Sequence, residues 1–124
     1  MHVVLADREA EIMQVLWEHG PSTVSEVRKH LTDNLAYTTV LTILRTLESK
    51  GYVGHQSEGK AHRYSALVKR EVARRSALVD LSTKLFQGSM ALLLVHLVSD
   101  QRLSDGEVAR IRRLLRDQRK KDRQ

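Results

Sequence analysis

The fold is decided by residues 36–51, which read AYTTVLTILRTLESKG. At about 100° per residue, the apolar side chains of this stretch gather on one side of a helix. They are Tyr37, Val40, Leu41, Leu44 and Leu47, with Ile43 at the flank. The other side carries Thr38, Thr42, Arg45, Thr46 and Ser49, with Thr39 beside Ile43. The pattern predicts an amphipathic helix whose outer face is short and polar.

That outer face differs from an ordinary solvated helix surface, which mixes long Glu and Lys side chains. The only acidic residue of the stretch, Glu48, projects from the other side of the helix. Threonine is a mediocre helix former, so helix propensity does not explain four threonines here. Short hydroxyls let a helix approach DNA closely, and arginine can grip guanine with two hydrogen bonds. We therefore predict a DNA recognition helix; the alternative is a solvated face that happens to be rich in threonine.

The preceding residues predict two shorter helices. Asp7 is expected to cap the first, which Gly20-Pro21 ends. The run Thr23-Val24-Ser25-Glu26 is a capping box that opens the second. Asp33-Asn34 then supplies the turn into the recognition helix. Short helices joined by a tight turn, followed by a hydroxyl-rich helix, are typical of a helix-turn-helix.

A β-hairpin is expected directly after the recognition helix. Gly51 ends the helix, and residues 52–57 and 61–66 read as strands around a turn at residues 57–60. A hairpin in this position is a wing. Lys60, His62 and Arg63 are candidates to contact phosphates beside the groove, although a solvated hairpin tip is the alternative.

Beyond residue 68 the pattern changes to three helices, so we expect a winged helix domain over residues 1–68 and a helical dimerisation region over 69–124 with a frayed basic tail. The segment 90–98 is apolar nearly all round. Such helices cannot cover one another within so short a region, and a second copy is the commonest partner. The expected dimerisation residues are Val79, Leu85, Leu93, Leu94, Leu97, Ile111, Leu114 and Leu115. The fold class is mainly α with a small β-hairpin.

Charge is unevenly distributed along the chain. The net charge is +6 over 124 residues, yet residues 1–66 carry −1 and residues 67–124 carry +7. Bulk charge is therefore weak support for DNA binding by the winged domain. The expected interface requires its cations to share one face: Arg28, Lys29, Arg45, Lys50, Lys60 and Arg63.

Several function classes are disfavoured. Cysteine is absent, which excludes disulfides, thiolate metal sites and cysteine nucleophiles. No phosphate-binding glycine loop, zinc-protease motif or catalytic triad spacing is present, so we expect no enzyme, no cofactor and no small-molecule substrate. His55 and His62 can meet across the hairpin, but without a supporting carboxylate we expect no metal. The start has no secretion leader and no run is long enough to span a bilayer, so a cytoplasmic protein is expected.

The chain resembles the penicillinase repressor family of bacterial winged-helix regulators, which includes the methicillin-resistance repressors. The stretches that carry the resemblance are EIMQVLW at 11–17, TVSEV at 23–27, AYTTV at 36–40, KG at 50–51, GKAHRY at 59–64, and LS at 103–104 with Glu107, Leu114 and Leu115. They extend over about residues 5–116.

The resemblance implies a homodimeric repressor that binds an inverted-repeat DNA operator and controls β-lactam-response or cell-envelope genes, with a role in antibiotic resistance. Thr38, Thr39, Thr42, Arg45 and Thr46 would face the operator, with Lys60, His62 and Arg63 at the wing. In well-known members, a membrane sensor protease pathway leads to cleavage in the dimerisation region. The matching bond here is His96-Leu97. A copper-responsive branch carries clustered cysteines, which this chain lacks.

Two rival interpretations remain at the level of sequence. One is a winged helix that contacts only other proteins, which would favour an apolar or acidic recognition face. The other is a DNA-binding regulator released by a small molecule in the dimer cleft, with residues 90–98 lining the pocket.

Overall fold

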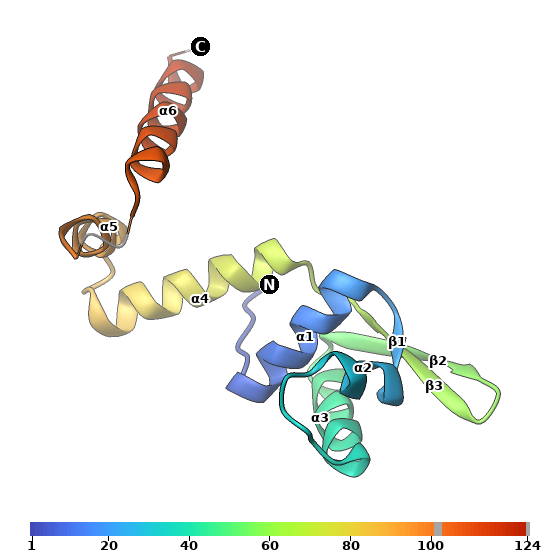
Figure 1. Cartoon of the computed structure of the whole chain (residues 1–124). Helices are drawn as coiled ribbons and strands as arrows, with labels where there is room; N and C mark the ends of the chain where they lie inside the picture. Colours follow the sequence, from blue (N-terminus) through green and yellow to red (C-terminus); the bar gives the residue numbers. More distant parts are fainter. Residues whose placement is uncertain (101–102, 124) are drawn as a thin grey trace. The chain divides into compact units, whose positions relative to one another are not determined.

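The computed structural model describes residues 1–100 and 103–123, which form two compact units. The first unit is Met1–Leu78 and the second begins at Val79. The elements (Figure 1) follow in the order α1 (Asp7–His19), β1 (Ser22–Thr23), α2 (Val24–His30), α3 (Tyr37–Ser49), β2 (Val53–Glu58), β3 (Ala61–Ala66), α4 (Arg70–Leu85), α5 (Met90–Ser99) and α6 (Asp105–Asp122). The predicted class, mainly α with a winged helix-turn-helix, is confirmed.

The core of the first unit lies between the helices and the sheet. Its fully buried side chains come from α1, α2, α3, β2 and β3, and include Ile12, Met13, Val27, Val40, Leu44, Leu47, Val53 and Tyr64. Leu44 and Leu47 lie on the predicted inner side of α3. Tyr37, expected on the same side, is 44% exposed because it lies in the first turn of the helix, beyond the edge of the core.

The helix ends test the predicted capping residues. Thr23 caps α2 in a reciprocal capping box with Glu26, as predicted. Ser104 caps α6 in the same way with Glu107. At α1 the prediction was wrong: Asp7 is the first helical residue and Ala6 occupies the cap position. Alanine has no side-chain acceptor, and the Glu9 carboxylate instead accepts a hydrogen bond of 2.8 Å from the Ala6 amide.

The sheet has three antiparallel strands in the order β1-β3-β2, and the hairpin β2–β3 projects from the helices (Figure 1). Sequence patterns missed β1, a two-residue strand that pairs Ser22 with Tyr64. The hairpin turn is also tighter than expected. Glu58 pairs with Ala61, so only residues 59 and 60 form the turn, and Gly59 has a φ of 62°. Glycine adopts this left-handed conformation without steric cost.

The first turns of α4 belong to the first unit. The Val3 amide donates to Ser76 Oγ over 2.9 Å, and Ala73 is buried in the core. The Trp17 indole donates to the Val68 carbonyl just before the helix. The contacts therefore divide the chain between Leu78 and Val79, inside α4, whereas the sequence placed the division at residue 68.

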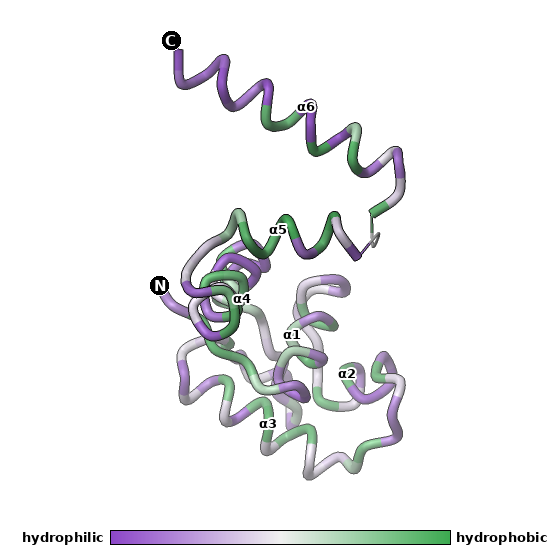
Figure 2. The backbone as a smooth tube through the Cα atoms, turned by 90° about the vertical axis from the view of Figure 1, so that its left-hand side faces the viewer, coloured by the Kyte–Doolittle hydropathy of each residue, from purple (hydrophilic) through white to green (hydrophobic). Residues whose placement is uncertain are grey.

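The second unit contains the last turns of α4, from Val79 on, together with helices α5 and α6. Figure 2 shows α5 as hydrophobic along most of its length and α6 as mainly hydrophilic. Leu93 is the buried residue of α5, and α6 has none within the described residues. None of the described helices is by itself long and apolar enough to span a membrane; α4 and α5 pass that test only as a pair bent by 87°.

Candidate nucleic-acid interface

The outer face of α3 consists of exposed side chains, as its periodicity predicted. Thr38, Thr39, Thr42, Arg45 and Thr46 are all exposed. Val40, Leu44 and Leu47 anchor the opposite side in the core. Burial of three side chains on one helix fixes the rotation of the helix, so the polar face points to solvent. The recognition residues predicted on α3 therefore share one accessible surface.

Two of the threonine hydroxyls are already engaged by the helix backbone. Thr42 Oγ1 donates to the Thr38 carbonyl over 2.8 Å, and Thr46 Oγ1 donates to the Thr42 carbonyl over 3.0 Å. The hydroxyl hydrogens are thus committed, whereas the oxygen lone pairs and γ-methyl groups can contact a ligand. Such threonines suit acceptor contacts and the methyl group of thymine. Any residue supplies the backbone carbonyl four positions earlier, so a threonine inside a helix is by itself the sequence signal for this bonding.

Arg45 is exposed and forms no ion pair within the described residues. It lies close to Tyr64 of β3, which is buried in the core. Burial raises the pKa of Tyr64 and the Glu48 carboxylate adds to this effect, while Arg45 acts in the opposite direction. The Arg45 guanidinium therefore sits where α3 meets the wing, with its charge not neutralised by a carboxylate of the described chain.

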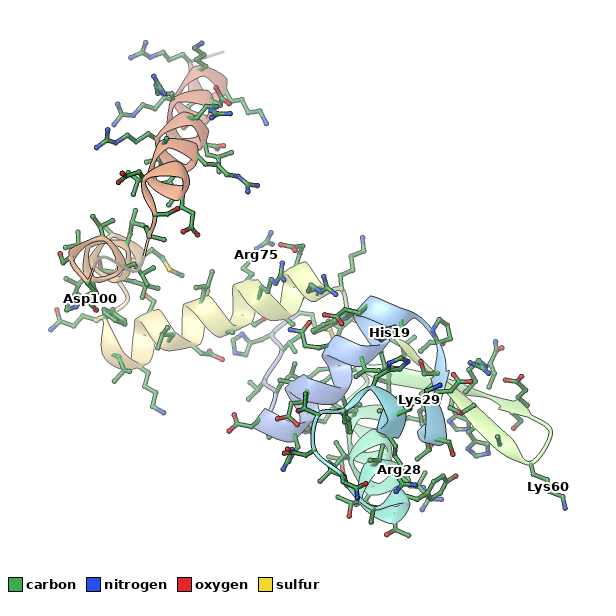
Figure 3. The ribbon with its side chains drawn as sticks, in the orientation of Figure 1. His19, Arg28, Lys29, Lys60, Arg75 and Asp100 are labelled. Carbon is green, nitrogen blue, oxygen red and sulfur yellow. The ribbon has the colours of Figure 1, made fainter. Side chains whose placement is uncertain are left out.

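The wing residues divide into a free tip and an anchored strand. Lys60 lies at the end of the hairpin and extends away from it (Figure 3), and it is exposed. Arg63 instead donates to Glu58 and Glu26 and to the Pro21 carbonyl, at 2.5, 3.0 and 3.0 Å. These hydrogen bonds, first to Glu58 and then to Glu26, raise the pKa of Arg63.

Arg63 therefore fastens the wing to α2 in the free protein. The same contact lowers the pKa of Glu26, mainly through its hydrogen bonds from Arg63 and also through the Thr23 amide. The sequence grouped Arg63 with Lys60 at the wing tip. The structure separates them, since Arg63 lies in the middle of β3, opposite Gln56.

His55 and His62 meet across the hairpin, as their positions indicated. Their rings stack with centroids 4.3 Å apart and planes inclined by 12°. His55 Nδ1 lies 2.5 Å from a Glu48 oxygen, which links the strand to α3. His62 is exposed on the wing. Within residues 1–100 and 103–123, no group of three or more His, Asp or Glu side chains is arranged to hold a metal ion.

The six cations named for the expected interface are used in different ways. Lys50 binds both carboxylate oxygens of Glu9 at 2.9 Å, and Glu9 is only 5% exposed. Arg28 donates through Nε to the Leu35 carbonyl. Lys50, Arg28 and Arg63 thus serve the fold. Lys29, like Arg45 and Lys60, is exposed and forms no ion pair in the described part of the chain.

The predicted dimerisation residues differ in exposure within the single chain. Leu93 is buried, and Leu94 and Ile111 are half-buried. The others are exposed by 41–67%: Val79, Leu85, Leu97, Leu114 and Leu115. His96, at the matching cleavage bond, forms a T-shaped ring pair with Phe86, with the ring centroids 5.3 Å apart. The second unit therefore keeps a small core and leaves most of its large apolar side chains uncovered.

The model of the penicillinase repressor family matches residues 5–117, almost the whole chain. This chain belongs to the penicillinase repressor family. The transcriptional regulator BlaI of Mycobacterium tuberculosis is 36% identical over 115 residues, which cover 90% of this chain and 82% of that protein. The penicillinase repressor of Bacillus licheniformis is 25% identical over 119 residues, covering 91% and 90%. The resemblance read from the sequence motifs is confirmed.

A solved structure of the same family contains DNA. The solution structure of monomeric Bacillus licheniformis BlaI in complex with the blaP half-operator matches this chain with a TM-score of 0.50 and 30% identity. The match covers 58% of this chain and 90% of that one.

Proposed function

We propose that this chain is a sequence-specific DNA-binding transcriptional repressor that acts as a homodimer on an inverted-repeat operator. The observation that carries the proposal is the outer face of α3, where four threonines and an exposed arginine replace the usual mixture of Glu and Lys. Membership of the penicillinase repressor family supports it, as does the half-operator complex of a relative. β-Lactam-response or cell-envelope genes are the proposed targets.

In this proposal, α3 lies in the major groove and reads bases. Arg45 supplies a forked donor for guanine, and Thr42 and Thr46 supply acceptors and methyl groups. Lys60 at the wing tip holds a phosphate next to the groove, a contact that positions the protein without selecting sequence. His62 lies on the same hairpin and is proposed to add to this contact.

Dimerisation would explain tight binding. The exposed leucines of the second unit are proposed to pack against a second copy, so that two winged domains occupy two half-sites. The relative from Bacillus licheniformis forms a complex with a half-operator as a monomer, which supports one winged domain per half-site. Linking two such domains can raise affinity by about 10²–10⁴-fold through effective concentration.

Loss of the dimer is the proposed route to release, with cleavage near His96-Leu97 through a membrane sensor protease pathway as its cause. The bond lies in the last turn of α5, where the Asp100 amide bonds to the His96 carbonyl. Terminal turns unwind more readily than helix centres, and a protease requires an extended segment. Cleavage there separates α6 from the rest of the chain.

Genome-wide mapping of bound DNA tests the function directly. The expected result is a small set of sites that share an inverted repeat near β-lactam-response or cell-envelope genes. Purified protein should then bind the full repeat more tightly than one half-site. Binding without a shared motif would contradict sequence-specific repression, and equal affinity for both duplexes would contradict the dimer. Mass spectrometry of the native protein after β-lactam challenge tests cleavage, which an intact chain with derepressed genes would exclude.

A further inference from the structure

The strongest charge concentration in the chain lies on α6, outside the predicted interface. Residues 109–123 hold eight Lys and Arg and only two Asp. At about 100° per residue, six of the cations gather within about a third of the helix circumference. We call this set the basic face of α6: Arg112, Arg113, Arg116, Arg119, Lys120 and Arg123. Five of them line one hollow, with Asp117 as the only carboxylate among the described residues beside them.

Helix stability accounts for only part of this arrangement. Cations in the last turn interact favourably with the helix dipole, which explains Arg119 and Lys120. Arg112, Arg113 and Arg116 lie further from the end and gain little from it. No cation of the basic face forms an ion pair within residues 103–123. Six like charges on one face repel one another, so a polyanion that binds there is strongly favoured.

The distribution of charge points to DNA as that polyanion. The winged domain carries the recognition helix, yet residues 1–66 have a net charge of −1. Most non-specific affinity for duplex DNA comes from cations that neutralise phosphates. In this chain the surplus of cations follows residue 66, and much of it lies on α6. The second unit can thus supply the charge that the first lacks.

An anionic membrane surface fits the helix less well. Helices that lie in a membrane interface bury a continuous apolar face, often with aromatic residues. The last apolar residue of α6 is Leu115, and the helix contains no aromatic residue. Arg116, Arg119 and Lys120 follow Leu115 in a segment with nothing to insert into lipid. This segment matches a charged rod such as duplex DNA instead.

We propose that the basic face of α6 binds the phosphate backbone of duplex DNA and supplies a sequence-independent part of the affinity. The inference rests on the proposed function, since it assumes that the chain binds duplex DNA. The face spans about 16 Å along the helix axis between residues 112 and 123. A duplex carries one charge per about 1.7 Å of its axis, so this length faces several phosphates.

A matched pair of double variants of the full chain tests the proposal. Arg116→Gln with Arg119→Gln removes two charges from the basic face. Arg110→Gln with Lys121→Gln removes two charges from the far side of the same helix. Glutamine has a helix propensity close to that of arginine and lysine, so α6 should remain folded, which circular dichroism checks. Affinity for an operator duplex and a shuffled duplex is measured between about 50 and 200 mM salt.

The basic-face variant should weaken binding to both duplexes by the same factor. The slope of log affinity against log salt should fall by about 0.9 for each phosphate that the variant no longer neutralises, whereas the far-side variant should keep the wild-type slope. Equal slopes in the two variants would overturn the proposal. So would unchanged DNA binding together with weakened binding to phosphatidylserine vesicles, which would indicate a membrane surface.

A different result would contradict the proposed function itself. A wild-type chain that does not distinguish operator from shuffled duplex contradicts sequence-specific repression, whatever the slopes of the variants. A chain that prefers the operator but shows equal slopes contradicts only the role of α6.

Discussion

Replacing Arg45 with alanine removes the one forked donor on the exposed face of α3. If this side chain grips a guanine, its removal should cost about 1–3 kcal/mol per half-site, or about five- to 150-fold in affinity at 25 °C. The shuffled duplex offers no matching base, so its affinity should change much less. The discrimination between the two duplexes should therefore fall by most of this factor.

The structure indicates that Arg45→Ala breaks no ion pair in the described part of the fold. Arg45 is exposed and has no ion pair among the described residues, so its removal strands no carboxylate there. Surface substitutions of this kind usually change stability by less than about 0.5 kcal/mol. Fluorescence anisotropy with a duplex that carries one half-site avoids any contribution from dimerisation. Arg45→Lys is the matched control, since it keeps the charge and loses the planar fork.

Two results would refute base readout by Arg45. An equal drop in affinity for operator and shuffled duplex would make it a phosphate contact. Full recovery of discrimination in Arg45→Lys would show that a point charge is enough and that the bidentate geometry plays no part.

The other interactions give four predictions. Lys60→Ala should weaken operator and shuffled duplexes alike and lower the salt slope by about 0.9, and an unchanged slope would exclude the wing tip from the interface. Arg63→Ala should lower the melting temperature because it removes the ion pairs that Arg63 forms with Glu58 and Glu26; an unaltered melting curve would show that this anchor is dispensable. Leu114→Asp should give folded monomers in analytical ultracentrifugation, because Leu114 is 58% exposed in the single chain, while dimers of normal affinity would contradict the interface. Arg63 lowers the pKa of Glu26 below its ordinary value of 4.5, so the stabilisation by this ion pair is complete above pH 4.5 and is lost as the pH falls through the lower pKa of the folded state. Glu26→Gln should therefore flatten the acid side of the plot of melting temperature against pH, and a plot like that of the wild type would contradict this role of the ion pair.

Local patterns predicted most of the winged domain. The inner side of α3, the capping box at Thr23 and the glycine after α3 depend on residues a few positions apart, so the sequence displays them directly. The strand β1 could not be found in this way. It has two residues, and it exists because Ser22 and Thr23 meet β3 some forty residues later. Non-local pairing of such a short segment has no periodicity to detect.

The sequence predicted where the site residues lie on their elements, but it did not predict which residues they bind. The exposure of Thr38, Thr42 and Arg45 follows from helical periodicity. The anchoring of Arg63 does not, because Glu26 is 37 residues away and reaches it only after α2 and β3 have packed together. The tight hairpin register also matters, since it places Arg63 within the strand and Lys60 alone at the turn.

Lys50 and Glu9 show why counting charge is a poor guide to this interface. Both read as ordinary surface residues in the sequence, one favourable and one unfavourable for DNA. In the structure the Glu9 carboxylate is buried, accepts the Ala6 amide and binds the Lys50 ammonium with both oxygens. A buried carboxylate without such a partner would be strongly destabilising, so Lys50 is committed to the fold. The charge available to DNA is therefore set by which cations have neither a carboxylate nor a carbonyl partner among the described residues. These cations include Lys29, Arg45 and Lys60 in the winged domain and the basic face on α6.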